Sequence, residues 1–165
     1  MMNAAEKIKF SPGILSKWQE KVDLLNETLG VSATVIMKVH PEEIEVFVSS
    51  ENDENPFLPG DRGELSIGMY CDSVIASKQQ VEIPDALLDD YWKEKLKCNN
   101  GMQSYMGLPI LYPNEDLFGT ICILNQESRQ FSELDRKLFN HFRESIEADL
   151  IIDEQNDIIR NTSIY

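Results

Sequence analysis

The sequence is poor in the residues that build disulfide frameworks and metal centres. It has three cysteines, Cys71, Cys98 and Cys122, and no two of them stand at Cys-x-x-Cys spacing. It has two histidines, His40 and His141, which are far apart in the chain. A sparse, odd set of cysteines disfavours both a disulfide scaffold and a zinc site. We therefore expect no bound metal.

Basic residues and long apolar runs are also scarce. The chain has 15 Lys and Arg residues against 29 Asp and Glu residues, which gives a formal net charge of -14. Such a surface repels phosphate backbones and anionic lipid headgroups, so we expect no nucleic-acid partner and no membrane partner. No stretch approaches the roughly 20 apolar residues of a membrane-spanning helix, and the opening segment does not resemble a signal peptide. The expected location is the cytoplasm.

The composition that remains is that of one globular domain. Hydrophobic residues make up 42% of the 165 residues and charged residues 27%, which disfavours disorder. We expect an N-terminal tail at 1–10, one domain at 11–150, and a linker or signalling-helix extension at 151–165. The last segment has a polar run between two isoleucine pairs, which suggests that the chain is the N-terminal part of something longer.

Capping signals and apolar periodicity predict a helix at each end of the domain. Ser11 followed by Pro12 favours a helix start, and Gly30 favours a helix end. Ser132, with Asp135 three residues later, predicts the start of a long second helix. Apolar residues recur every three or four positions in both segments. They are Ile14, Trp18, Val22, Leu25 and Leu29 in the first, and Leu134, Leu138, Phe142, Ile146 and Leu150 in the second.

Between these helices the pattern predicts two hairpins, a surface loop and short helices; the loop and short helices are called the cover below. Alternating β-branched residues predict paired strands at 34–40 and 43–50, and a second pair at 103–111 and 117–125. Residues 51–68 are rich in Pro and Gly and predict a surface loop. Short helices are expected at 70–77 and from Pro84-Asp85 through Trp92, with a strand at 81–83.

The second hairpin has two different faces, because successive side chains of a strand point to opposite sides. One face is aliphatic, and we assign it to the layer of the terminal helices: Ser104, Met106, Leu108, Ile110, Ile121 and Ile123. The other face is mixed, and a pocket is expected there under the loops and short helices: Gln103, Tyr105, Gly107, Thr120, Cys122 and Leu124.

Four segments, in order, resemble bacterial GAF domains. They are YCDSVI at 70–75, VEIPDA at 81–86, YMGLPI at 105–110 and FGTICILN at 118–125, and FSELD at 131–135 fits the last helix of the same family. The resemblance is to the subset found N-terminal to diguanylate cyclase (GGDEF) or histidine kinase domains. It implies an α+β fold with a central antiparallel sheet of about six strands. Terminal helices would cover one face, and short helices and loops would cover a pocket on the other.

The resemblance implies a non-catalytic sensory or regulatory domain. It would bind a small ligand, dimerise, or do both, and so control a covalently linked output domain such as a diguanylate cyclase or histidine kinase. No cofactor is identified. The candidate ligand-binding residues lie on the mixed face and its cover: Tyr70, Tyr91, Trp92, Gln103, Tyr105, Thr120 and Cys122. The alternative is that the aromatic residues fill a core without ligand and that Cys122 is an inert buried thiol.

Family members commonly dimerise through the terminal helices, so a parallel homodimer is expected. The candidate interface residues come from the two apolar stripes: Ile14, Trp18, Val22, Leu138, Phe142 and Ile146. The alternative is that these stripes only cover the sheet. In a dimer without ligand, the chain would be a bare dimerisation scaffold.

Other members of the fold suggest further activities, which the residues support less well. Free methionine-(R)-sulfoxide reductases share the fold, and Cys71 and Cys98 lie near positions where they carry thiols. Their substrate-binding carboxylates would fall at about Tyr105, Cys122 and Leu124, none of which is acidic. The signature of cyclic-nucleotide-binding members is incomplete, and no histidine stands in the pocket segments where bilin-binding members need one.

Overall fold

A single antiparallel sheet forms the centre of the computed structural model, which describes residues 10–162. Within that range the sheet has six strands in the order β3-β2-β1-β6-β5-β4. Their bounds are Ala33–Val39 (β1), Glu43–Ser49 (β2), Arg62–Glu64 (β3), Val81–Ile83 (β4), Ser104–Leu111 (β5) and Leu117–Asn125 (β6). Both predicted hairpins and the short strand at 81–83 are present, and β3 is an added edge strand inside the predicted loop 51–68.

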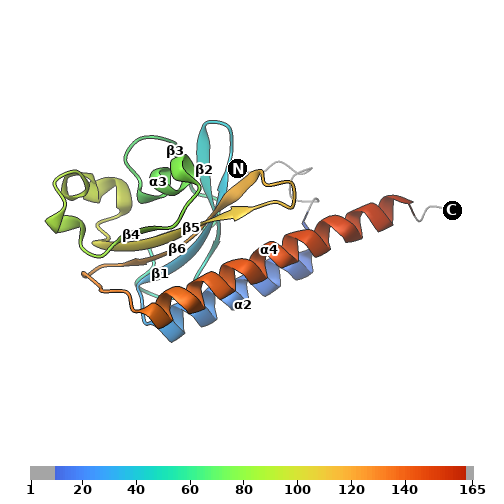
Figure 1. Ribbon diagram of the computed structural model, residues 1–165, viewed down its shortest axis with the longest axis horizontal. Helices are drawn as coiled ribbons and strands as arrows, with labels where there is room; N and C mark the ends of the chain where they lie inside the picture. Colours follow the sequence, from blue (N-terminus) through green and yellow to red (C-terminus); the bar gives the residue numbers. More distant parts are fainter. Residues whose placement is uncertain (1–9, 163–165) are drawn as a thin grey trace.

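Two long helices lie side by side on one face of the sheet (Figure 1). Helix α2 spans Pro12–Leu29; the Ser11 hydroxyl accepts a hydrogen bond from the backbone N–H of Ile14, and Gly30 ends the helix at φ 65°. Helix α4 spans Glu133–Thr162. Ser132 and Asp135 exchange side-chain-to-backbone hydrogen bonds of 2.9 and 3.0 Å, which is the predicted capping arrangement. No helix within residues 10–162 is long and apolar enough to cross a membrane.

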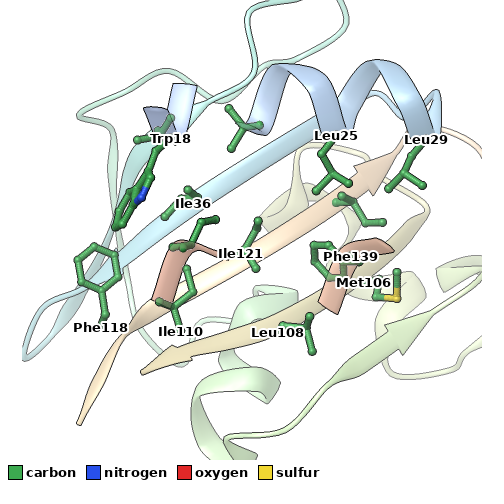
Figure 2. Packing of buried hydrophobic residues seen from close by; sticks show 14 of the residues in the cluster. Trp18, Leu25, Leu29, Ile36, Met106, Leu108, Ile110, Phe118, Ile121 and Phe139 are labelled. Carbon is green, nitrogen blue, oxygen red and sulfur yellow. The ribbon is translucent and has the colours of Figure 1, made fainter. Parts of the chain in front are cut away.

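The apolar stripe of α2 is buried against the sheet (Figure 2), and so are Ile146 and Leu150 of α4, whereas Leu134 at the start of the α4 stripe is 73% exposed. Ile14 is 5% exposed, and Trp18, Val22 and Ile146 are 0% exposed. The indole Nε1 of Trp18 donates to Asp149 Oδ2 of α4 at 3.1 Å, so its one polar group is also used within the chain. These four residues are therefore core residues, and the expectation that they contact a second chain is wrong.

The two remaining candidate interface residues, Leu138 and Phe142, are partly buried and pack against the same core. They too belong to the layer between α4 and the sheet. The alternative that the stripes cover the sheet therefore holds for the positions that the sequence selected. Part of each of these two side chains stays accessible to a second chain, so the interface stays a prediction at Leu138 and Phe142.

The two faces of the β5–β6 hairpin are divided as predicted. Met106, Leu108, Ile110, Ile121 and Ile123 belong to the core beneath α2 and α4. Tyr105, Cys122 and Leu124 belong to a second core on the opposite face. Three helical segments cover this second core: α3 (Tyr70–Ser77), η1 (Ala86–Leu88) and η2 (Trp92–Asn99).

The cover differs from prediction after β4. We expected one helix from Pro84-Asp85 through Trp92, but two 3₁₀ segments are present because Asp89 has an extended backbone, with φ -113° and ψ 121°. The Asp89 carboxylate accepts hydrogen bonds from the backbone N–H groups of Tyr91 and Trp92, at 2.9 and 3.1 Å. This arrangement starts the second helical segment, as an N-cap does.

Candidate ligand-binding site

A cavity of about 160 Å³ lies on the sheet face opposite α2 and α4. Its walls come from β1, β2, β5 and β6, and its rim comes from β3, the start of α3 and the end of η2. The apolar wall residues include Val35, Met37, Ile44, Val46, Leu124 and Met69. The polar and sulfur-containing residues at the cavity are Asp61, Arg62, Asn99, Asn100, Tyr105, Cys71, Cys98 and Cys122. The fold thus places the cavity where the mixed face of the second hairpin predicted a pocket.

Of the candidate ligand-binding residues, Tyr105 and Cys122 line this cavity. Tyr70 and Trp92 lie in the cover, with ring centroids 5.0 Å apart, and the Tyr70 ring lies 5.1 Å from that of Tyr105. The Tyr70 hydroxyl donates to the carbonyl of Met102 at 2.6 Å. These two aromatic residues therefore pack the layer above the sheet and do not line the cavity.

Three other candidates also lie outside the cavity walls. Tyr91 is 59% exposed and contacts Trp92 edge to face, with centroids 4.8 Å apart. Gln103 is half-buried just before β5, and its backbone N–H donates to the carbonyl of Asn125. Thr120 is fully buried, and its hydroxyl lies 3.6 Å from the sulfur of Cys71. The sequence pattern placed Tyr91 and Gln103 on the correct side of the sheet, but neither side chain lines the cavity.

Asn99 holds the rim together and was missed by the sequence analysis. Its side-chain oxygen accepts from the backbone N–H of Tyr70 at 2.8 Å, and its Nδ2 donates to the carbonyls of Gly68 and Lys95 at 3.1 and 3.0 Å. The side chain is 4% exposed, so these bonds join η2 to the start of α3 in a water-poor environment. In the sequence it was one of several polar residues in a turn-like run, which carries no signal for this role.

Arg62 is a second residue that sequence reasoning missed. Its guanidinium lies 3.3 Å from Glu45 Oε1 and 3.6 Å from Glu43 Oε1. Its Nε is a buried donor without a hydrogen-bond partner among the described residues. A buried N–H without a partner is unfavourable, and Arg62 is the one of three such arginines within residues 10–162, with Arg129 and Arg143, that lines the cavity.

The cavity also holds a pair of thiols. Cys71 Sγ lies 3.8 Å from Cys122 Sγ and 3.3 Å from the Tyr105 hydroxyl. Hydrogen bonds from Cys122, Tyr105 and Thr120 lower the pKa of Cys71 although burial opposes them. Burial, with the neighbouring thiols, raises the pKa of Tyr105 well above its ordinary value. Cys122 is buried, as the alternative interpretation expected, but it has a partner that the sequence did not indicate, because Cys71 stands 51 positions away in sequence and faces it in space.

Within residues 10–162, no three His, Cys, Asp or Glu side chains are grouped so that they could hold a metal ion. The polar groups at the cavity are hydrogen-bonding side chains and thiols. Together with the apolar walls, they form a site suited to an organic ligand.

A six-stranded antiparallel sheet, with its terminal helices on one face and a covered cavity on the other, defines a class of sensory and regulatory domains. The GAF domain family matches residues 18–150, and the chain belongs to this family. Comparison with curated protein sequences gives no match.

Solved structures of the same fold come from proteins with different activities. The GAF domain of an Acinetobacter phosphoenolpyruvate-protein phosphotransferase has a TM-score of 0.70 and 15% identity, over 96% of this chain and 100% of that one. The phycoerythrobilin-bound GAF domain of a cyanobacterial phytochrome has a TM-score of 0.74 and 14% identity, over 92% and 91%. A free methionine-R-sulfoxide reductase from Neisseria meningitidis, in complex with its substrate, has a TM-score of 0.69 and 16% identity, over 87% and 81%. Likeness at this identity establishes the fold and leaves the activity open.

Proposed function

We propose that this chain is a non-catalytic sensory or regulatory GAF domain that binds a small molecule in the cavity between the sheet and its cover. The observation that supports this most directly is the cavity itself, about 160 Å³ in volume. An apolar hollow with a few converging polar groups is the usual form of a small-molecule site.

The ligand class follows from the size and lining of the cavity. Its volume is below the roughly 300–1,000 Å³ of sites for drug-sized molecules. The walls are mainly aliphatic, and Arg62 Nε is a buried donor in need of an acceptor. The proposed ligand is therefore a small, mainly apolar molecule with a hydrogen-bond acceptor, about the size of an amino acid or a small aromatic acid.

Shared strands connect the cavity to the helices, and an ion pair connects the edge strand β4 to α4. In β6, Cys122 contacts the cavity while Ile121 and Ile123 pack beneath the helices. In addition, Arg136 of α4 donates to Glu82 of β4, with Nη2 and Oε2 3.1 Å apart. Displacement of β6 by a ligand would thus reach the layer of the helices, whereas β4 does not line the cavity and would move only through its pairing with β5.

Helix α4 supports a second part of the proposal, that the domain controls an output domain joined to its C-terminal end. The helix continues past the sheet and ends well away from it (Figure 1). A diguanylate cyclase or a histidine kinase attached there, in a parallel homodimer, would receive changes in the position of α4. Under this proposal the domain works in the cytoplasm, beside such an output domain.

A second candidate function is that of a free methionine-(R)-sulfoxide reductase. Its support is that Cys71, Cys98 and Cys122 all line one cavity and that a reductase has the same fold. An assay of free methionine sulfoxide with dithiothreitol as reductant tests it. Turnover that Cys98→Ser or Cys71→Ser abolishes would overturn the non-catalytic proposal.

The ligand proposal is tested by thermal melting against a defined panel of amino acids, small aromatic acids and nucleobases. A ligand present at 100 times its Kd stabilises by about 2.7 kcal/mol, so a binding compound should raise the melting temperature clearly. If no compound does so, the bare dimerisation scaffold is favoured instead.

A matched pair of glycine variants shows whether such a compound binds in the cavity. A Cβ at Gly63 would lie 3.6 Å from Met69 Cε, an ordinary contact, so Gly63→Val should fold and extend its methyl groups into the cavity. Gly13→Ala, on α2, is the control. We expect the first variant to lose the ligand response and the second to keep it; an unchanged response in Gly63→Val would place the ligand elsewhere.

A further inference from the structure

Two thiols from opposite walls of the cavity face each other. Cys71 is the second residue of α3, and Cys122 is in the interior of β6. Their sulfur atoms are 3.8 Å apart, and the side chains are 7% and 2% exposed. Helix α3 packs directly on β5 and β6, and this packing brings the two residues together.

The sulfur of Cys71 is surrounded by hydrogen-bond donors. The Tyr105 hydroxyl lies 3.3 Å from it and the Thr120 hydroxyl 3.6 Å from it, and the Cys122 thiol can donate as well. The sulfur of a neutral thiol is a weak acceptor, whereas a thiolate is a strong one. Buried donors that converge on one sulfur therefore favour its ionised form.

The two thiols consequently differ in proton affinity. The pKa of Cys71 is lowered by the hydrogen bonds from Cys122, Tyr105 and Thr120, against burial and the nearby Asp72 carboxylate. The pKa of Cys122 is raised well above its ordinary value by its hydrogen bond to Cys71 and by burial. Cys71 is thus the more easily ionised of the two thiols, and disulfide formation starts from such a thiolate beside a thiol.

We infer that Cys71 and Cys122 form a redox pair, which hydrogen peroxide oxidises to an intramolecular disulfide. The Cys71 thiolate attacks one peroxide oxygen, the O–O bond breaks, and the departing hydroxide takes the Cys122 proton and becomes water. The Cys122 thiolate then attacks the Cys71 sulfenic acid; the S–S bond forms, the S–O bond breaks, and the second hydroxide is protonated by solvent. The two sulfurs lose two electrons, and the peroxide is reduced to two waters.

This inference goes beyond the proposed function and does not require a ligand in the cavity. It does connect the redox state to the cavity, because the sulfurs must approach from 3.8 Å to about 2 Å. That movement draws the start of α3 toward β6 and removes the sulfur acceptor of the Tyr105 hydroxyl. Since Met69, Cys71 and Tyr105 all line the cavity, oxidation changes its walls.

The test is thiol mapping of the full chain after exposure to hydrogen peroxide. Reduced protein is treated with peroxide and alkylated under denaturing conditions, and its peptides are mapped by mass spectrometry without reductant. We expect two thiols to disappear per chain, a Cys71 peptide joined to a Cys122 peptide, and full reversal by dithiothreitol. A disulfide that contains Cys98, one between two chains, or three unreacted thiols would overturn the inference.

Two cysteine variants separate the steps. Cys98 lines the same cavity, and its thiol contacts the Ile67 carbonyl at 3.6 Å, so it is the matched control. Cys98→Ser should form the same disulfide as the parent. Cys122→Ser should stop at a sulfenic acid on Cys71, which dimedone captures; capture at Cys98 instead would contradict the assignment of the nucleophile.

A third variant tests the role of the donors without removing a thiol. Tyr105→Phe deletes the hydroxyl that lies 3.3 Å from Cys71 Sγ. Because a hydrogen bond to a charged group is worth more than a neutral one, the thiolate fraction near neutral pH should fall roughly tenfold. The midpoint of the pH profile for Cys71 alkylation should rise accordingly. An unchanged profile would show that the hydroxyl does not favour the thiolate.

Discussion

The aromatic ring of Tyr105 occupies the space above Gly107, two residues further along the same face of β5. A Cβ on Gly107 would lie 2.1 Å from the Tyr105 hydroxyl oxygen and 2.5 Å from Cζ. Gly107 is paired with Cys122 across the hairpin, so its missing side chain leaves the room through which the Tyr105 hydroxyl reaches the thiols. The absence of a side chain at one position thus determines the geometry of the cavity wall.

The first prediction is that Gly107→Ala displaces the Tyr105 ring. A distance of 2.1 Å is far inside van der Waals contact, so the ring must rotate or the strand must shift. We expect a loss of about 1–3 kcal/mol, as is usual for overpacking, measured by urea unfolding. The alkylation rate of Cys71 should also fall toward that of Tyr105→Phe, and a variant with unchanged stability and unchanged rate would contradict the stated contact.

The second prediction is that Gly119→Ala, in β6, destabilises the protein more than Gly107→Ala does. Its added Cβ would lie 1.7 Å from the backbone oxygen of Met37 in β1, where only movement of a whole strand can relieve the clash. The expected loss is larger than the roughly 1–3 kcal/mol of ordinary overpacking. The two glycine variants are compared in the same urea series, and a smaller loss for Gly119→Ala than for Gly107→Ala would count against it.

The sequence predicted the layers of this fold because local signals and burial agree there. Ser11, Gly30 and Ser132 mark helix ends through backbone hydrogen bonds that their own side chains or conformations determine. The alternation of β5 and β6 separates the two faces, because a shift by one residue would expose an entire aliphatic set. Such features depend on near neighbours in the chain and so can be identified without a structure.

The site was predicted less well because it depends on contacts between distant segments. The 3.8 Å approach of Cys71 to Cys122 joins a helix to a strand across 51 positions. The links from Asn99 to Tyr70 and Gly68 are of the same kind. Likewise, apolar periodicity cannot distinguish a helix face that covers a sheet from one that contacts a partner chain. It therefore placed Trp18 at a dimer interface, whereas Trp18 lies in the core.

The third prediction is that the N-cap of α4 contributes measurably to stability. The Ser132 hydroxyl accepts a hydrogen bond of 3.0 Å from the backbone N–H of Asp135. Ser132→Ala should cost about 1 kcal/mol, the usual value for loss of such a cap. Ser16→Ala, at an exposed position within α2, is the control and should change stability by less than about 0.5 kcal/mol. Equal effects of the two substitutions would mean that the cap contributes nothing.

The fourth prediction concerns alkaline pH. Burial, with a smaller effect of Asp85, raises the pKa of Tyr70 from 10.0 to about 12, and burial raises that of Tyr105 well above the ordinary value. Deprotonation therefore favours the unfolded chain: the contribution to stability is complete below pH 10 and is lost as the pH rises toward 12. Tyrosinate absorbance and circular dichroism should report these two phenols ionising together with unfolding.

Tyr70→Phe is the control for the alkaline transition. It removes one of the two buried phenols and the hydrogen bond to the Met102 carbonyl. Because fewer protons are released on unfolding, stability should fall less steeply with pH above 10 than in the parent. If every tyrosine of the parent ionises while the circular dichroism stays that of the folded protein, the pKa values of Tyr70 and Tyr105 do not oppose ionisation in the folded state, and the prediction is wrong.

The last prediction is a parallel homodimer through the C-terminal part of α4, in place of the stripes that cover the sheet. Ile151, Ile152, Ile158 and Ile159 are 42%, 52%, 56% and 61% exposed. They form two pairs spaced by seven residues, which keeps each pair on one side of the helix, as in a coiled coil. A second copy of α4 would cover this apolar surface and place both C-terminal ends side by side.

Sedimentation at micromolar concentration should show a dimer for the parent, a monomer for Ile152→Glu and a dimer for the control Leu88→Glu, whose side chain is 86% exposed on the cover. Trp18→Glu, in contrast, should unfold the chain because it buries an unpaired charge in the core, and a monomeric parent would refute the dimer.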